Sequence, residues 1–174
     1  HRGGDVYTQE YKKGITQSEL KQSGKTDKTG TKITFYPDYE IFVGQKYEFE
    51  IIDERLRELA YLNSGITVSL KEEKTQRTTT HFYEGGLSEF VVHLDQNHSP
   101  VFEEPVHIKG EKEGIPVDLA IRYNDSYTET MLTFVNNINT IEGGTHLAGF
   151  KAALTRSLNK YATKNNLFKP IKGK

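Results

Sequence analysis

Cysteine is absent from the 174-residue chain, which excludes disulfide bonds, thiolate chemistry and cysteine-based zinc sites. The chain also has no apolar run long enough to cross a membrane, and no stretch resembles a secretory signal peptide. Its net charge is only −1, so no overall field draws it to nucleic acid or to a membrane surface. We therefore expect a cytoplasmic protein without membrane partners.

Methionine occurs only once, at Met131, and the first residue is His1. For this reason we expect the chain to be a piece of a longer protein. Its length suffices for one or two small domains. Hydrophobic residues make up only 34% of the chain, but 10 tyrosines and 9 phenylalanines supply large side chains for a core.

Apolar periodicity predicts a first helix over about residues 48–63. Its apolar positions recur at steps of three and four residues and form one stripe: Phe49, Ile52, Leu56, Leu59 and Leu62. The charged residues between them are expected to face solvent: Asp53, Glu54, Arg55, Arg57 and Glu58. Gly65 follows, where a left-handed helix stop is favoured.

The rest of the first half reads as short strands and loops. Alternation predicts strands over residues 6–11, 32–36, 66–70 and 78–83, with a loop over 23–31 and a short helix over 87–94. Residues 95–105 carry two prolines and break the periodicity. We place a domain boundary there, giving domains at residues 1–96 and 97–174.

Three further strands are predicted over residues 106–112, 115–123 and 128–136, joined by tight turns into a meander. A second helix follows Gly143 and Gly144, with Thr145 as its expected N-cap. Its apolar stripe is expected to cover the meander: Leu147, Phe150, Leu154, Leu158 and Tyr161. Together these elements predict an α+β fold.

No motif forms a self-contained active site. Gly24-Lys25-Thr26 resembles the end of a phosphate-binding loop, but Glu19 stands where that loop requires glycine. Gly143 to His146 is either an anion site at a helix N-terminus or a capped bend, and the bend is favoured. The other histidines form no metal-binding or triad-like set, so we expect no catalytic residue and no metal ligand in the chain.

Basic residues collect at the C-terminal end. Because the last 24 residues carry +7 and the whole chain −1, the first 150 carry −8. Four of the basic residues lie on the second helix and are candidate contacts for DNA phosphates: Lys151, Arg156, Lys160 and Lys164. The alternative is an ordinary solvated helix face.

Thr29-Gly30-Thr31 lies where a loop enters a predicted strand, and the triplet alone favours a simple glycine turn. It belongs, however, to a series of motifs in a characteristic order. These are KTDKTGT (25–31), RLRELAYLNSG (55–65), YEGG (83–86), EEP (103–105), GEKEG (110–114) and residues 123–150, YNDSYTETMLTFVNNINTIEGGTHLAGF. Across nearly its whole length, the chain resembles the ATPase subunits of type IIA topoisomerases, the B subunits of gyrase and topoisomerase IV.

That resemblance implies both architecture and activity. It implies that residues 1–96 are the C-terminal part of a GHKL-type ATPase α/β sandwich and residues 97–174 the first part of a transducer domain. The parent would use ATP and Mg²⁺ to drive DNA strand passage and negative supercoiling. Its partners would be DNA, the A subunit of gyrase and a second copy of the B subunit. By the same resemblance, Thr31, Gly30 and Ile33 belong to an adenine pocket.

The resemblance also implies which parts lie elsewhere. The family's catalytic glutamate, magnesium-binding asparagine and ATP lid precede the position of His1, and its QTK lysine follows Lys174, so we expect no ATP hydrolysis by residues 1–174 alone. EGG, EEP and YNDSY favour gyrase over topoisomerase IV. The remaining alternative is a non-catalytic nucleic-acid-binding or scaffold module.

Overall fold

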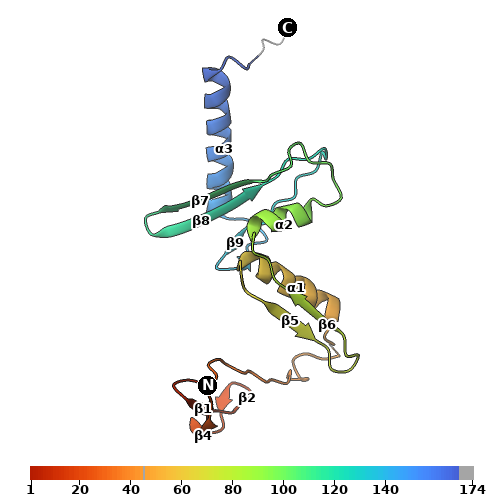
Figure 1. The fold of residues 1–174 in the computed structure, drawn as a ribbon, viewed down its shortest axis with the longest axis vertical. Helices are drawn as coiled ribbons and strands as arrows, with labels where there is room; N and C mark the ends of the chain where they lie inside the picture. The colour runs from red at the N-terminus through yellow and green to blue at the C-terminus, as the bar shows by residue number, and fades with distance from the viewer. Residues whose placement is uncertain (45, 169–174) are drawn as a thin grey trace. The chain divides into compact units, whose positions relative to one another are not determined.

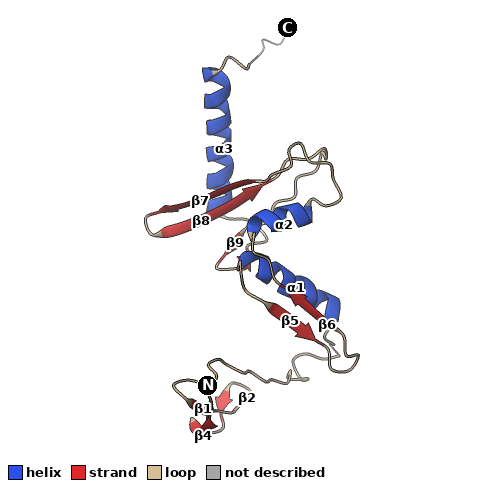
Figure 2. Ribbon diagram, viewed as in Figure 1, coloured by secondary structure: helices blue, strands red, loops and turns tan. Residues whose placement is uncertain are grey.

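The computed structural model describes residues 1–44 and 46–168, and the chain divides into two compact units, His1–Glu48 and Phe49–Lys174. The first unit contains short strands and long loops, and the second contains helices and strands joined by loops (Figures 1 and 2). The predicted α+β class is therefore confirmed at this level. None of the helices within the described ranges has the length and apolarity needed to cross a bilayer.

The first unit consists of two small antiparallel pairs. Strand β1 (Asp5–Thr8) pairs with β4 (Lys21–Lys25), and β2 (Tyr11–Lys12) pairs with β3 (Ile15–Thr16) across a turn in which Lys13 and Gly14 both have positive φ. The predicted loop over residues 23–31 was thus wrong at its start, because residues 23–25 belong to β4.

The strand predicted over residues 32–36 was also wrong. No regular strand is assigned there, and the side chains that gave the alternation are exposed: Ile33 by 80%, Phe35 by 68% and Tyr36 by 88%. A strand needs a hydrogen-bonded neighbour, and no strand of the described residues pairs with this segment.

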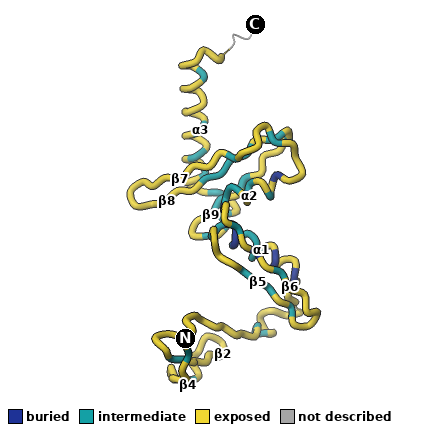
Figure 3. Tube along the Cα trace, in the orientation of Figure 1, coloured by how far each residue is buried: buried dark blue, intermediate teal, exposed yellow. Residues whose placement is uncertain are grey.

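The core lies in the second unit, which contains all of the buried residues of the described chain, drawn dark blue in Figure 3. Helix α1 (Phe49–Leu62) buries Phe49, Ala60 and Tyr61, and its C-terminus is closed by the Asn63 amide, which donates to the Leu59 carbonyl at 2.7 Å. Gly65 follows with φ 81°, as predicted. The predicted helix is confirmed, but its apolar stripe is only partly buried, since Phe49 is buried and the other stripe residues are half-buried: Ile52, Leu56, Leu59 and Leu62.

A hairpin and a second helix pack on α1. Strands β5 (Val68–Lys71) and β6 (Thr78–His81) pair antiparallel, and α2 (Leu87–Leu94) follows and buries Phe90. The Tyr61 ring stacks between Tyr83, at 3.6 Å between centroids, and Phe90, at 4.9 Å. This aromatic stack joins helix, strand end and second helix into one core.

The predicted three-stranded meander was wrong in its third strand. Strands β7 (Val106–Lys112) and β8 (Ile115–Ile121) form the expected hairpin, whose turn residues Glu113 and Gly114 have positive φ. The following chain instead folds on itself, with β9 (Phe134–Val135) paired to β10 (Ile138–Asn139). The predicted strand over 128–136 is regular only at residues 134–135, and the left-handed pair Asn136 and Asn137 makes a tight turn that pairs this segment with β10 instead of β8.

Helix α3 (Thr145–Lys164) begins where predicted, but it does not cover a sheet. None of its residues is buried, and Leu158 and Tyr161 are 54% and 62% exposed. The expected N-cap was wrong by one residue, since Gly144 takes that place and Thr145 is already helical. The apolar stripe of α3 is thus present in the sequence without being buried within the described residues.

Candidate functional site

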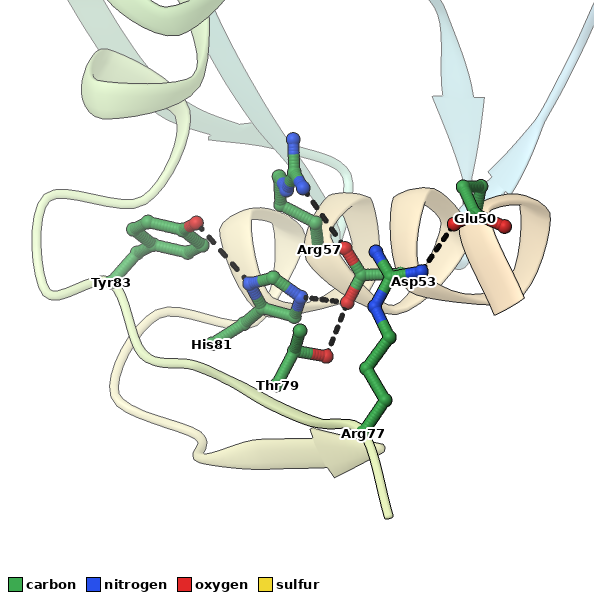
Figure 4. Close-up of polar contacts among 7 residues, drawn as sticks. All are labelled: Glu50, Asp53, Arg57, Arg77, Thr79, His81 and Tyr83. Carbon is green, nitrogen blue, oxygen red and sulfur yellow. Dashed lines mark hydrogen bonds and ion pairs between the residues drawn. The ribbon is translucent and has the colours of Figure 1, made fainter. Parts of the chain in front are cut away.

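A cluster of polar side chains lies between α1 and the β5–β6 hairpin, around Asp53 (Figure 4). Asp53 Oδ1 accepts hydrogen bonds from the Thr79 hydroxyl at 2.5 Å and His81 Nε2 at 2.7 Å, and Oδ2 pairs with Arg57 at 2.9 Å. Asp53 was predicted to face solvent, but only 7% of it is exposed. The prediction was wrong because the hairpin packs on that side of the helix and supplies the hydrogen bonds that a buried carboxylate requires.

These hydrogen bonds keep the carboxylate ionised. The Thr79 hydroxyl, followed by His81 and Arg57, lowers the pKa of Asp53 from 3.8 to about 2, against the raising effect of burial. Because Asp53 is ionised, His81 Nε2 carries a proton and donates it toward the carboxylate. His81 Nδ1 then faces the Tyr83 hydroxyl at 3.5 Å.

The same geometry excludes a Thr-His-Asp triad. A triad requires the imidazole to lie between the carboxylate and the nucleophile, so that it can accept the nucleophile's proton. Here Thr79 and His81 both donate to the same oxygen of Asp53, and Thr79 directs its proton at the carboxylate. The Asp53 cluster therefore holds α1 to the hairpin and has no arrangement for nucleophilic catalysis.

A second buried charge pair joins α2 to β8. Arg122 Nε lies 3.1 Å from Asp95 Oδ2, and both side chains are at most 10% exposed. Asn124 also donates to Asp95 through its amide. Neither Arg122 Nε nor Asp95 Oδ2 has an aligned hydrogen-bond partner among the described residues, so charge holds this pair together. The pair fixes the C-terminal end of α2 against the strand that follows the predicted domain boundary.

Two of the three predicted adenine-pocket residues share one concavity. Gly30 and Thr31 line a hollow of about 680 Å³ in the first unit, together with His1, Arg2, Gly3, Asp5, Tyr7 and Leu20. The Gly30 amide donates to the His1 carbonyl at 3.2 Å, which fixes the loop there. Ile33 does not line this hollow and is 80% exposed.

The predicted DNA contacts are all exposed on α3: Lys151, Arg156, Lys160 and Lys164. Lys151 pairs with Glu129 at 3.0 Å, so part of its charge is compensated. The remaining basic residues of the C-terminal end, Lys169, Lys172 and Lys174, lie outside the described residues. Arg156, Lys160 and Lys164 follow one another at steps of four residues and share one exposed side of α3, whereas Lys151 lies on another side.

The start of α3 offers no further site. His146 Nε2 lies 3.3 Å from the Thr140 hydroxyl, and the Gly143 amide donates to the Thr140 carbonyl at 2.7 Å. This supports the interpretation of residues 143–146 as a bend. Within residues 1–44 and 46–168 no group of three histidine or carboxylate side chains is arranged to hold a metal ion.

The model of the DNA gyrase B family matches residues 86–174. The chain belongs to the DNA gyrase B family. Among curated gyrase B subunits, it is 46% identical to that of Halalkalibacterium halodurans over 97% of the chain and 27% of the relative. It is likewise 46% identical to that of Staphylococcus aureus over 99% of the chain and 27% of the relative. The chain thus spans about a quarter of the length of these gyrase B relatives.

Solved gyrase B structures share its fold. The 43K ATPase domain of Thermus thermophilus gyrase B, crystallised with an aminocoumarin, is 33% identical and superposes with a TM-score of 0.81, covering 99% of this chain and 47% of that one. The B subunit of gyrase from Myxococcus xanthus, at 24% identity, has a TM-score of 0.78 over 92% of this chain and 48% of that one. The predicted family membership is confirmed, and gyrase is favoured over topoisomerase IV.

Sequence reasoning missed the Asp53 cluster. Two signals for it were present: Asp53 and Arg57 stand one helical turn apart, and Thr79 and His81 alternate onto one face of a strand. Neither pattern indicates on its own that the two faces meet.

Proposed function

We propose that this chain is part of the B subunit of an ATP-dependent type II DNA topoisomerase, a gyrase that couples ATP binding and hydrolysis to strand passage and negative supercoiling. The observation that carries the proposal is the gyrase B family match over residues 86–174. The similarity to an ATPase domain structure at 33% identity over 99% of the chain supports it. The complete protein is cytoplasmic and uses ATP and Mg²⁺ as cofactors. Its partners are DNA, the A subunit of gyrase and a second copy of the B subunit.

Within this proposal, residues 1–96 belong to the ATPase domain and residues 97–174 to the transducer. Gly30, Thr31 and Ile33 contribute to the adenine pocket. Support for the first two is their position in one concavity of the first unit. The exposed basic residues of α3 contact DNA phosphates through charge, without reading base sequence.

Supercoiling of relaxed plasmid tests the proposed activity. The complete B subunit containing this chain, combined with the A subunit of gyrase, should introduce negative supercoils in the presence of ATP and Mg²⁺. It should introduce no negative supercoils when ATP is replaced by a non-hydrolysable analogue. The analogue is supplied at less than one molecule per enzyme molecule. An ATP-independent effect, or no change in linking number with ATP, would contradict the proposal.

A further inference from the structure

Two hydrogen bonds join α1 to the turn between β9 and β10, across more than seventy residues of sequence. The Arg55 guanidinium donates from Nη2 to the Asn137 carbonyl at 2.8 Å. The Asn137 amide donates from Nδ2 to Asn63 Oδ1, also at 2.8 Å. The Asn137 backbone carbonyl is therefore bonded to α1, and its side-chain amide to Asn63, the residue that follows α1. Arg55 and Asn63 both lie on the other side of the predicted boundary at 96/97 from Asn137.

The turn has the geometry needed to present Asn137 in this way. Asn136 and Asn137 adopt φ of 50° and 65°, a left-handed pair that asparagine tolerates better than most residues. Asn63 is held in turn, because its own amide donates to Leu59 at the end of α1. Arg55, Asn63 and Asn137 are each only partly exposed, so both bonds are partly shielded from water.

Hydrogen bonds continue from this turn to the start of α3. Strands β9 and β10 pair through residues 134–135 and 138–139, and Thr140 and Thr133 bond to each other beyond them. The Gly143 amide then donates to Thr140, and His146 in the first turn of α3 lies against the Thr140 hydroxyl. A shift of the turn would thus be transmitted to the glycine bend from which the basic helix departs.

Little else fixes this hairpin to α1. A cavity of about 290 Å³ lies between α1, α2 and the β9–β10 segment, lined by Glu54, Phe90, His93, Leu132 and Asn139 among others. Beside it, Phe90 and Phe134 make a loose aromatic contact at 6.5 Å between centroids. Figure 1 shows β9 next to α1 and α2. Because packing next to the turn is incomplete, the two hydrogen bonds are the most direct contacts between the hairpin and this end of α1.

We propose that Arg55, Asn63 and Asn137 form a latch that positions the β9–β10 hairpin, and through it α3, relative to α1. They act as positioning residues for coupling between nucleotide and DNA, a role that rests on the proposed gyrase function. None of the three touches the proposed adenine pocket residues or the proposed DNA contacts. Breaking the latch should therefore reduce coupling while leaving each separate activity in place.

The test uses the complete B subunit together with the A subunit of gyrase, and it compares five variants. Arg55→Ala and Asn63→Leu each remove one latch bond. Asn63→Leu also removes the bond from the Asn63 amide to the Leu59 carbonyl. Asn63→Asp loses that same bond but keeps an acceptor for the Asn137 amide, so it separates the latch bond from the bond to Leu59. Glu58→Gln breaks only the Arg55–Glu58 pair, and Asn136→Gly changes only the exposed neighbour in the same turn. The measured quantity is the number of supercoils introduced per ATP hydrolysed, alongside ATP turnover without DNA.

Arg55→Ala and Asn63→Leu should lower supercoiling per ATP by about fivefold or more, with DNA-free ATP turnover within about twofold of wild type. Asn63→Asp, Glu58→Gln and Asn136→Gly should keep the wild-type ratio. Unchanged coupling in both latch variants would overturn the proposal. So would equal losses of ATP turnover and supercoiling together with a lower melting temperature, because those indicate a merely structural contact.

Hydrogen exchange of residues 1–174 separates failure of the latch from failure of the proposed function. If the wild-type protein shows no ATP-dependent supercoiling, the proposed function fails, and the latch is judged from exchange alone. Amides of the β9–β10 hairpin should then exchange faster in Arg55→Ala and Asn63→Leu than in Asn136→Gly. Equal exchange rates in all three would overturn the latch.

Discussion

At the scale of single residues, Asp53 shows what a sequence pattern does and does not contain. Helical periodicity assigned five charged residues of α1 to solvent, of which Glu54 is exposed, Arg55, Arg57 and Glu58 are half-buried and Asp53 is buried. Asp53 is buried because a hairpin beginning fifteen residues downstream of it places Thr79 and His81 over it. Side-chain chemistry permits such a pairing, but only the tertiary arrangement selects it.

The lowered pKa of Asp53 predicts an acid-sensitive contribution to stability. Because its folded pKa of about 2 lies below the unfolded 3.8, the contribution is complete above about pH 5 and is lost as pH falls toward 2. Asp53→Asn should destabilise residues 1–174 by about 1–3 kcal/mol at pH 7, since it leaves Arg57 and His81 without their carboxylate. The deficit should shrink by about 1.5 kcal/mol between pH 5 and pH 2.5.

Urea unfolding followed by helical circular dichroism measures this difference. Glu54→Gln, the adjacent exposed carboxylate on the same helix, is the control and should change the free energy of unfolding by less than about 0.5 kcal/mol at either pH. A deficit for Asp53→Asn that stays constant with pH would show that the Asp53 charge does not contribute in this way.

The predicted adenine pocket is also a matter of single side chains. In the complete B subunit, Thr31→Val removes one hydroxyl with little change in shape, and it should weaken binding of an ATP analogue about three- to tenfold. Thr16→Val, on an exposed strand that does not line the same hollow, should leave affinity unchanged. Isothermal titration measures both, and wild-type affinity in Thr31→Val would remove Thr31 from the pocket.

At the scale of elements, local sequence patterns predicted the bounds of those helices and strands that depend mainly on local sequence. Helix α2 and strand β7 have the predicted bounds, and α1 differs by one residue at each end. The errors in the predicted strands lie where pairing with another strand, or a turn, determines the structure. Residues 32–36 and 128–133 have no paired neighbour among the described strands, and the Asn136–Asn137 turn pairs β9 with β10 instead of β8.

The exposed basic residues of α3 predict how DNA affinity depends on salt concentration. In the complete B subunit, replacing Arg156, Lys160 and Lys164 by glutamine should weaken binding to duplex DNA equally for all sequences. It should also reduce the slope of log affinity against log salt by about 0.9 for each phosphate that is no longer neutralised. Lys71→Gln, at the exposed end of β5, is the matched control. Anisotropy titrations at several salt concentrations measure the slope. An unchanged slope would indicate that these residues form an ordinary solvated helix face and do not contact DNA.

At the scale of the whole molecule, the order of motifs identified the family correctly, while composition alone would have indicated only a globular domain. Burial is concentrated in the second unit, where Phe49, Ala60, Tyr61 and Phe90 form the apolar core. The sequence did not reveal this concentration, because the first unit carries large apolar residues as well, such as Phe35 and Tyr36. Which of these large apolar residues are buried depends on tertiary neighbours that sequence periodicity does not identify.

This concentration predicts that residues 49–174 fold by themselves. All helices of the described residues and all the buried side chains lie in that unit, so urea unfolding at 222 nm should show one cooperative transition. Its free energy of unfolding should lie within about 0.5 kcal/mol of that of residues 1–174. A broad, non-cooperative transition would show that the first unit contributes to the core.

The contact between Arg55 and Asn137 spans 82 residues, which has a consequence for the order of assembly. Helix α1, the β5–β6 hairpin and α2 bring together residues close in sequence, so the loops they close are short and their entropy cost is low. During synthesis these elements leave the ribosome before the Asn136–Asn137 turn is made. We therefore expect the turn to dock on a surface that has already formed, so that its two hydrogen bonds are among the last native contacts of this segment to form.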